Sequence, residues 1–293
     1  MKAGRGLIIT ADDFGLSIEV NEAVEQGHRT GVLTCASLVV TGAAAEDAVR
    51  RARTMPNLGV GLHLALVDAP SAMPPSRIPD LIDASTGALG ARPAVTGALI
   101  ALSPKVRGQA RAEIAAQFEL YRKTGLPLEH VDGHWHFHQH PWITDILVDE
   151  MAPRFGVTAV RVPNEPALAS WRAAGRRGLP RRAFAAAAHA PLWGRLRRRL
   201  KHAGIGANDW FFGFNDGGAM DRDQLLRTVA SLPPGVSEIG LHPASSPPSG
   251  PHPLPAHWRA ADERAALTDP DVIEACRAVR LGRFADLVRG AAA

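Results

Sequence analysis

The sequence predicts an α/β protein in which parallel strands alternate with helices and close into a barrel. Short apolar runs of strand type alternate with stretches of helical periodicity along the whole chain, and about seven such units can be counted. A single barrel domain commonly has a length close to the 293 residues of this chain. Polar residues recur where the apolar runs end, which is where the chemistry of such barrels is found.

The predicted elements follow one another in a regular order. The first strand, residues 7–10, is apolar and ends in an acidic pair and a glycine turn. The other predicted strands are residues 32–40, 58–66, a strand that enters the histidine-rich segment at residue 128, 159–162, 210–214 and 237–243. The predicted helices are residues 18–28, 43–53, 109–123, 142–155, 223–231 and a closing stretch from about 263 to 289.

Two of these strands carry candidate ligands. Asp12 and Asp13 follow the first strand directly, and adjacent residues of an extended chain face opposite ways. One carboxylate could therefore reach a cation while the other lies beside a reacting water. Alternatively, the aspartate pair caps the N-terminus of the following helix. His63 lies in the middle of the apolar run 58–66, so it is either a ligand at a cavity or a hydrogen-bonded core histidine.

Residues 130–141, HVDGHWHFHQHP, contain five of the 12 histidines of the chain. If this segment is extended, its period of two turns six side chains toward one side: His130, Asp132, His134, His136, His138 and His140. Imidazole and carboxylate groups suit zinc and its neighbours. We expect at most two of these histidines to be direct ligands, and the others to contact substrate or to orient the ligands. Adventitious binding, as by a purification tag, is disfavoured because the run is internal.

Four motifs resemble the YdjC-like carbohydrate deacetylases, relatives of the chitooligosaccharide deacetylases. They are TADDFG, GLHL, HVDGHWHFHQHP and EIGLHP, and the resemblance covers nearly the whole chain. It implies an incomplete TIM-like barrel of about seven parallel strands. The segment AVRVPNEP, residues 159–166, resembles the branch found with hopanoid biosynthesis. The chain departs from the family pattern at Trp135, where the family often has another histidine.

Position by position, the resemblance implies that Asp13, His63 and His134 hold one divalent metal ion. Two histidines and one aspartate leave coordination positions open for water and a carbonyl oxygen, as in catalytic sites. Zinc and magnesium are the candidate cofactors, and two imidazoles favour zinc. The implied reaction is hydrolysis of the N-acetyl group of an amino sugar, which yields acetate and a free amine.

The remaining site residues follow from the same resemblance and from side-chain chemistry. Asp12 is the predicted general base, and His242 is the predicted general acid, acting as an imidazolium. Arg161 either positions Asp12 or binds a carboxylate of the substrate. The substrate-binding candidates are Trp135, His136, His138 and Asn164.

Several alternative functions remain open on these residues. The acetylated sugar could be the head group of a hopanoid lipid or a soluble chitooligosaccharide. Glycoside hydrolysis is disfavoured because it uses two carboxylates and no metal, and phosphoester hydrolysis because it usually needs two metals and more carboxylates. A barrel without catalysis that binds sugar or membrane is the alternative from another class.

Composition limits the location of the protein. Cys35 and Cys276 are too few for a disulfide framework, so a reducing compartment is expected. The first strand begins within a few residues of the N-terminus, and no stretch has 18 uninterrupted apolar residues. We expect one domain over residues 1–293, located in the cytoplasm, with or without peripheral contact to the inner membrane.

Two insertions into the barrel are predicted. Residues 166–208 contain ten basic and no acidic residues, so the rest of the chain has a net charge of 23 − 29 = −6. Large apolar residues accompany these arginines, a mixture that suits contact with an anionic membrane through residues 171–201. The alternatives are a solvated segment paired with acidic residues elsewhere and, less favoured, nucleic acid. Residues 67–108, rich in proline, glycine and alanine, are expected to cover part of the cleft.

Overall fold

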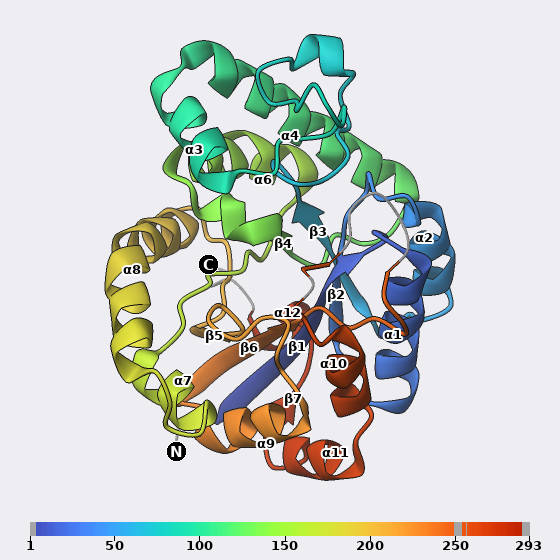
Figure 1. The fold of residues 1–293 in the computed structure, drawn as a ribbon, viewed down its shortest axis with the longest axis vertical. Coiled ribbons are helices and arrows are strands. Elements are labelled where there is room, and N and C mark those ends of the chain that lie inside the picture. Colours follow the sequence, from blue (N-terminus) through green and yellow to red (C-terminus); the bar gives the residue numbers. More distant parts are fainter. Residues whose placement is uncertain (1–3, 249–253, 256, 289–293) are drawn as a thin grey trace.

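Parallel strands form the centre of the molecule, and most of their side chains are buried (Figure 1). The computed structural model describes residues 4–248, 254–255 and 257–288. The strand order is β4-β3-β2-β1-β6-β5, β7 also pairs with β1, and every pairing between these strands is parallel. The strands are β1 (Arg5–Phe14), β2 (Cys35–Leu38), β3 (Gly59–Leu64), β4 (Val131–Gly133), β5 (Trp210–Phe212), β6 (Gly235–Leu241) and β7 (Arg280–Leu281).

The sheet curls into an incomplete barrel, as predicted, and residues 159–164 occupy the interval between β4 and β5. Arg161 N donates to Val131 O, and on the other side Phe211 N donates to Asn164 O, each over 3.0 Å. Pro163 has no N–H group and cannot donate to either neighbour. The predicted strand at residues 159–162 is therefore present only as isolated bridges.

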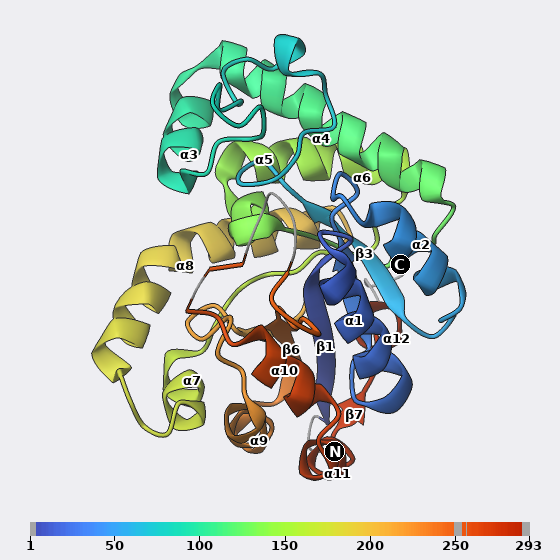
Figure 2. The same ribbon diagram turned by 45° about the vertical axis from the view of Figure 1, so that its right-hand side comes forward.

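Helices surround the sheet (Figures 1 and 2). They are α1 (Ile18–Thr30), α2 (Ala45–Arg53), α3 (Pro93–Leu102), α4 (Pro104–Thr124), α5 (Pro141–Ile146), α6 (Ala152–Phe155), α7 (Ala167–Ala173), α8 (Leu179–His202), α9 (Arg222–Ser231), α10 (Ala260–Leu267), α11 (Pro270–Cys276) and α12 (Phe284–Leu287). A π-helical turn, Leu147–Met151, joins α5 to α6. Among the described helices, none combines the length and apolar character needed to cross a bilayer.

Local signals explain where the helices begin and end. The Ser17 side chain accepts a hydrogen bond from Val20 N and caps α1. Ser103 caps α4 in the same way, and Pro104 occupies its first turn, so this helix begins five residues before the predicted start at 109. Gly125 ends α4 with a left-handed backbone, φ 72°.

The two predicted insertions contribute their own helical elements. Residues 67–108 contain a short 3-10 helix, Pro75–Arg77, then α3 and the start of α4. Residues 166–208 contain α7 and α8, and α8 lies along one margin of the barrel in both views (Figures 1 and 2). Trp193, Leu196 and Leu200 are buried and anchor α8 on the barrel.

Candidate active site

The carboxyl end of β1 places two aspartates toward different partners. The register of β1 with β2 shifts between Ala11 and Phe14, and Asp13 adopts a left-handed backbone with φ 63°. Aspartate tolerates this region better than most residues, although it is strained. Both oxygens of Asp12 face Arg161, whereas Asp13 faces His63 and His134. The two carboxylates do diverge as expected, but a local kink separates them rather than the alternation of a regular strand.

The three predicted metal ligands meet at this point. Asp13 Oδ1 lies 3.0 Å from His134 Nδ1 and 3.5 Å from His63 Nε2. One ligand atom from each side chain lies within 4.8 Å of the others. Asp13 and His63 are buried, and neither oxygen of Asp13 receives a hydrogen bond from the described part of the chain. Because a buried carboxylate without a donor is costly, this geometry is compatible with a bound divalent cation.

A second carboxylate fixes the orientation of His63. His63 Nδ1 donates to Asp132 Oδ1 over 2.8 Å, so Nε2 is left to face Asp13. Ser37 Oγ in turn donates to Asp132 Oδ2 over 2.7 Å. Metal-ligating histidines usually have such a carboxylate partner, which sets the tautomer and ring orientation. The predicted pattern included Asp132 among the residues of one face but did not assign it this role.

The electrostatics of the cluster follow from its burial. Burial alone would raise the pKa of Asp13, but His134 and His63 hold it well below its usual value. Burial alone would lower the pKa of His63, but Asp132 and Asp12 raise it to about 9. The His63 ring is therefore an imidazolium at neutral pH when no cation is bound, with a second proton on Nε2. Metal binding must release that proton, which couples metal affinity to pH.

The histidine-rich segment is not extended beyond Gly133, so the prediction of six side chains on one side is wrong. β3 ends at Leu64, which pairs with Gly133, and the chain beyond has no further strand to bond. It forms a short 3-10 helix, His134–Gln139, with left-handed backbones at Trp135 and His136. His134 reaches Asp13, whereas the other four histidines point to different surroundings.

Each of these histidines has its own environment. His130 is buried, contacts Ser37 Oγ at 3.1 Å and stacks on Phe284. His138 is fully buried, and its Nε2 donates to Arg161 O over 2.9 Å. His140 precedes α5. Of the four, only His136 joins His134 on the wall of the candidate active-site cavity.

Arg161 lies beneath the ligands in a fully buried cluster of charges. Its guanidinium donates to both oxygens of Asp12, each over 2.8 Å, and lies 2.7 Å from Asp132 Oδ2. It also donates to Glu238 Oε1 over 2.8 Å, and Thr10 Oγ1 donates to the same oxygen. Because Arg161 has no exposed surface, it positions Asp12 rather than binding a carboxylate of the substrate.

Sequence reasoning did not identify Glu238 as part of this cluster. A single carboxylate inside the apolar strand 237–243 was the available signal, because such a group is rarely buried unless it is paired. Burial raises the pKa of Glu238, although the Arg161 charge opposes this rise. Together Asp12, Asp132 and Glu238 place three carboxylates around one guanidinium.

His242 lies on the same cavity wall as the candidate ligands His63 and His134. Its Nε2 is 3.9 Å from Asp12 Oδ2, its ring centroid is 4.1 Å from that of Trp258, and its backbone N–H donates to Glu263. Burial lowers the pKa of His242, although Asp13 and Asp12 oppose the shift. The side chain is therefore neutral at pH 7, which differs from the imidazolium expected from the sequence.

These groups open onto a cavity of about 370 Å³, within the usual range for small-molecule sites. Asp12, His63, His134 and His242 lie on its wall. The rest of the described wall is rich in aromatic and small residues: Gly133, Trp135, His136, Gln139, His189, Gly213, Phe214, Asn215, Gly217, Pro255, His257 and Trp258. His138, Asn164 and the segment 67–108 are not part of this described wall. Of the four residues predicted to contact substrate, Trp135 and His136 lie on the cavity wall.

Helix α8 supplies a wall residue that the sequence did not reveal. The His189 ring lies 4.8 Å from the Phe214 ring and 5.7 Å from the Trp193 ring. Phe214 also stacks on His136, with centroids 5.4 Å apart. His189 Nδ1 donates to Ala185 O, so the proton sits on that nitrogen and Nε2 is free to accept. One aromatic wall therefore joins the predicted insertion 166–208 to the histidine-rich segment.

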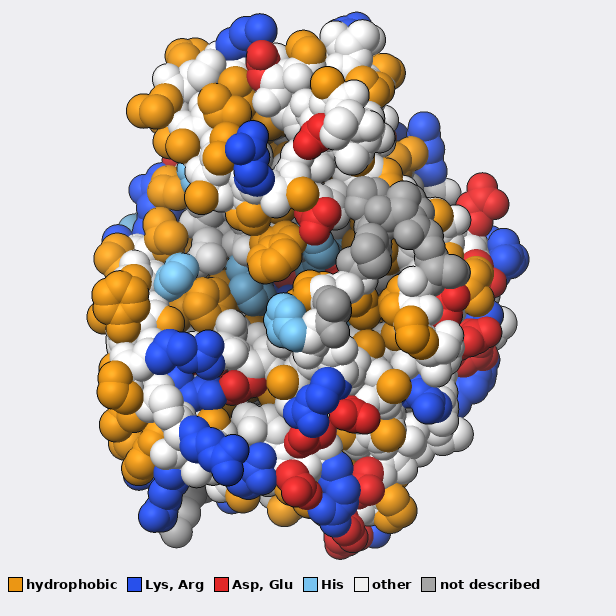
Figure 3. Space-filling model, in the orientation of Figure 1, with side chains coloured by type: hydrophobic (Ala, Val, Ile, Leu, Met, Phe, Trp, Pro, Cys, Tyr) orange, Lys and Arg blue, Asp and Glu red, His pale blue; other side chains and the backbone are white. Residues whose placement is uncertain are grey.

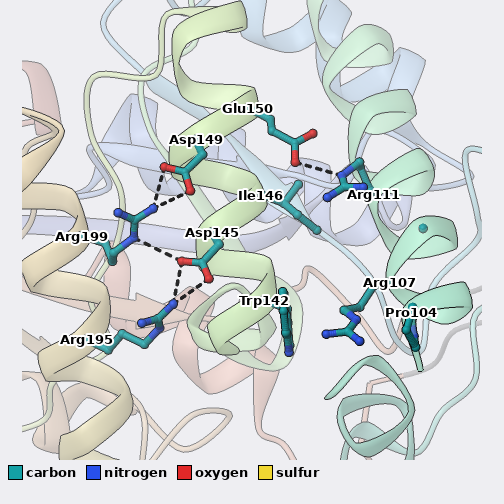
Figure 4. A pocket seen from close by; sticks show the side chains of 11 residues that line it. Pro104, Arg107, Arg111, Trp142, Asp145, Ile146, Asp149, Glu150, Arg195 and Arg199 are labelled. Carbon is teal, nitrogen blue, oxygen red and sulfur yellow. Dashed lines mark hydrogen bonds and ion pairs between the residues drawn. The ribbon is translucent and has the colours of Figure 1, made fainter. Parts of the chain in front are cut away.

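A larger cavity, of about 720 Å³, lies between α4, α5 and α8 (Figure 4). Arg195 and Arg199 of α8 bind Asp145, and Arg199 also binds Asp149. On the other side Arg111 binds Glu150, and Arg107 stacks over Trp142 at 4.0 Å. Three of its four arginines are paired with carboxylates, so this cavity is lined by a network that ties α8 to the barrel.

Comparison with known proteins agrees with this geometry. The family model described as "YdjC-like protein" matches residues 6–278. A carbohydrate deacetylase of Geobacillus stearothermophilus is 35% identical over 162 residues, which are 55% of this chain and 60% of that relative. A carbohydrate deacetylase of Mus musculus is 29% identical over 286 residues, which cover 90% of this chain and 88% of the relative. A chitooligosaccharide deacetylase of Proteus mirabilis is 32% identical over 144 residues, covering 49% of this chain and 54% of the relative.

A solved structure supports the fold alone. A protein of Enterococcus faecalis named for cellobiose-phosphate cleavage superimposes with a TM-score of 0.68 at 22% identity. The alignment covers 97% of this chain and 99% of that one. The match to the Geobacillus relative spans only about three-fifths of that relative's length, whereas the family model covers nearly all of this chain. The chain therefore belongs to the family of YdjC-like proteins.

Proposed function

We propose that this protein is a metal-dependent deacetylase that hydrolyses the N-acetyl group of an amino sugar. The observation that carries the proposal is the convergence of Asp13, His63 and His134 at a cavity whose wall also holds Asp12 and His242. The names of the curated relatives, carbohydrate and chitooligosaccharide deacetylase, point to the same reaction class.

The first step of the proposed mechanism is attack of water on the acetyl carbonyl carbon. A divalent ion held by Asp13, His63 and His134 would polarise the carbonyl and lower the pKa of a water molecule. Asp12 lies on the cavity wall and takes the proton of the attacking water. Arg161 holds both oxygens of Asp12, so the carboxylate keeps one orientation while each oxygen retains a lone pair.

The second step breaks the bond between the carbonyl carbon and the nitrogen. The amine needs a proton to leave, and His242 is placed to deliver it. His242 is neutral at rest, and its Nε2 lies 3.9 Å from Asp12 Oδ2. We infer that the proton collected by Asp12 passes to His242 and then to the amine. The products are acetate and a free amino sugar.

The structure disfavours the two rival hydrolytic reactions. Asp12 is the only carboxylate among the described residues of the cavity wall, so a carboxylate pair for glycoside hydrolysis is missing there. A second group that could hold a cation, Asp12, His63 and Asp132, shares His63 with the first. The two carboxylates of this second group, Asp12 and Asp132, are already neutralised by Arg161, which argues against the second metal ion of a phosphoesterase.

The substrate is proposed to be an N-acetylglucosaminyl head group on a hopanoid lipid. Support comes from the resemblance of residues 159–166 and from the aromatic wall of the cavity, since flat aromatic rings suit the apolar faces of sugars. A soluble chitooligosaccharide is the second candidate, favoured by the relative from Proteus mirabilis.

One experiment separates these substrates. Protein reconstituted with zinc or magnesium is incubated with an N-acetylglucosaminyl lipid and with chitooligosaccharides, and loss of the acetyl mass is followed. Faster loss from the lipid supports the hopanoid substrate, and faster loss from the oligosaccharides supports the second candidate. No acetate from either substrate with any divalent metal would contradict deacetylation and favour a barrel that only binds sugar.

A further inference from the structure

Helix α8 presents an unusual outer face. Trp193, Leu196 and Leu200 are buried against the barrel, so a soluble helix would be expected to have a polar opposite side. Instead six exposed positions at spacings of three and four are apolar, with the exposed Arg181 among them: Pro180, Ala183, Phe184, Ala187, Ala188 and Pro191. Phe184, at the centre of this stripe, is 76% exposed.

Basic residues flank the apolar stripe at both ends. Of the ten basic residues in 166–208, four have a carboxylate partner: Arg182, Arg195, Arg197 and Arg199. The other six have none among the described residues: Arg172, Arg176, Arg177, Arg181, Arg198 and Lys201. The segment contains no acidic residue that could neutralise them. One alternative predicted from the sequence was that the basic residues of this segment pair with acidic residues elsewhere. That alternative therefore holds for only four of the ten basic residues.

The stripe and the cavity belong to the same helix. His189 of α8 lies on the cavity wall, whereas the apolar stripe faces solvent. In Figure 3 apolar side chains follow the margin where α8 runs, basic side chains gather over α7 and the start of α8, and the histidines of the cavity lie nearer the centre. A surface that contacts this margin would therefore lie close to the cavity mouth.

We propose that the outer face of α8 binds the surface of a membrane containing anionic lipids. Phe184 and its apolar neighbours enter the boundary between headgroups and acyl chains, and the six unpaired cations contact lipid phosphates. Nucleic acid would match the cations but not an exposed phenylalanine flanked by alanines and prolines. The inference deepens the proposed function by naming the surface from which a lipid-linked sugar would enter the cavity, but docking itself requires no catalysis.

Vesicle flotation tests the proposal with the full chain. One set of vesicles contains phosphatidylcholine alone, and the other contains phosphatidylcholine mixed with phosphatidylglycerol. We expect binding only to the mixed vesicles, and weaker binding at high salt because the lipid charge is screened. Phe184→Ser should weaken binding by about tenfold or more, because serine has no large apolar side chain to transfer from water into the membrane. The double substitution Arg177→Gln with Arg198→Gln should weaken it by about tenfold as well.

Matched controls lie elsewhere on the surface. Leu102→Ser removes a side chain that is 83% exposed on α3, and Arg5→Gln with Arg92→Gln removes two exposed charges outside α8. Neither should alter flotation. All variants should hydrolyse a soluble N-acetylated sugar at the rate of the unmodified protein. Flotation therefore tests membrane docking, and hydrolysis tests catalysis independently.

Three outcomes would overturn the proposal. The first is equal recovery with neutral and anionic vesicles, or no recovery with either. The second is an equal loss of binding for Leu102→Ser and Phe184→Ser. The third is a concentration-dependent dimer, seen by sedimentation, that Phe184→Ser dissolves, which would assign the face to a second copy of the chain.

Discussion

Arginines bind carboxylates in two very different regions of this molecule. In the buried charge cluster, defined as Asp12, Asp13, His63, Asp132, Arg161 and Glu238, no member is more than 3% exposed. In the surface charge network of Figure 4, defined as Arg111, Asp145, Asp149, Glu150, Arg195 and Arg199, the side chains are 30–56% exposed. The hydrogen-bond distances are similar in the two regions, near 2.5–3.2 Å.

Similar distances have different consequences because the surroundings differ. Removing one partner from a buried pair leaves an uncompensated charge away from water, whereas water replaces a lost partner at the surface. The buried charge cluster therefore holds Asp12 and His63 in fixed orientations. The surface charge network ties α8 to the barrel, but water can replace a lost partner there, so the loss of one ion pair costs little stability. The following predictions test that distinction, in order of decreasing effect.

Asp12→Asn and Asp13→Asn should separate the roles of the two adjacent carboxylates. We expect Asp13→Asn to abolish metal retention and with it all turnover, because Asp13 is the only carboxylate in the predicted ligand set. Asp12→Asn should keep the metal and lose turnover by about 10²- to 10⁴-fold, as expected for loss of a general base. Metal analysis of the purified variants and acetate release measure the two effects.

Treatment of the unmodified protein with a chelator is the control for Asp13→Asn and should give the same loss, reversed by added metal. If Asp12→Asn loses the metal while Asp13→Asn retains it, the two roles are reversed.

Arg161→Gln should be the most destabilising single change in either charge region. It leaves Asp12, Asp132 and Glu238 buried without their cation, and we expect the free energy of unfolding to fall by about 3–5 kcal/mol. Denaturant titration measures this. Arg161→Lys keeps the charge but lacks the planar fork that contacts Asp12, Asp132 and Glu238 together, so it should lose activity more than stability. Equal stability of the Gln variant and the unmodified protein would mean that the buried charges are not held as described.

Glu263 is a buried carboxylate that forms no ion pair with an arginine of the described residues. It accepts hydrogen bonds from Met220 N and His242 N, and burial raises its pKa to about 7. Because this pKa lies above the unfolded value of 4.5, the folded state retains the proton longer, and stability falls as pH rises from about 5 to 7, by up to about 3 kcal/mol. Glu263→Gln should flatten the dependence of unfolding free energy on pH in that window. An unchanged slope would place the titration elsewhere.

Asp132→Asn tests the support of a ligand rather than the ligand itself. The variant keeps a side chain of similar shape but lacks the negative charge that orients His63, so metal affinity should fall by about 10- to 100-fold. Competition with a metal-binding dye measures the change. Ser37→Ala, which removes one donor to Asp132, should have a smaller effect in the same direction, and an effect of opposite sign would contradict the proposed chain of contacts.

Arg199→Gln in the surface charge network should have the smallest effect. Its partners Asp145 and Asp149 remain hydrated, so we expect a loss of less than about 1 kcal/mol in unfolding free energy and unchanged turnover. A loss as large as that of Arg161→Gln would remove the distinction between the two regions.

Sequence patterns predicted most of the barrel and several of the polar residues that meet at one end of it. Apolar runs bounded by turn residues located the strands, because burial requires that pattern wherever a parallel sheet is covered on both faces. Asp12, Asp13, His63 and His242 all follow or lie within such runs, so the topology alone brings them to one end of the sheet. The boundaries of α4 and the irregular segment 159–164 differed from prediction, since caps and prolines decide those locally.

The histidine-rich segment shows where such reasoning fails. Composition indicated that this segment belongs to the candidate site, and His134 does lie beside Asp13. The predicted alternation required an extended chain, which has no partner strand beyond Gly133. A turn with two left-handed residues then sends His134 to the ligand cluster and His138 into the core. No sequence period encodes that turn.

By itself the sequence determined the order of strands and helices, the residues that meet at the barrel end, and the separation of a basic segment from an otherwise acidic chain. Only the tertiary structure decided which arginines are paired, that Asp132 and Glu238 support the site, and that α8 turns His189 inward and Phe184 outward. The period of apolar residues along a segment indicates which of its side chains are buried, because side chains face the core at regular intervals in a strand or a helix. The partner of a charged side chain depends instead on segments distant in sequence, such as Asp12 and Arg161, whose contact exists only once the chain has folded.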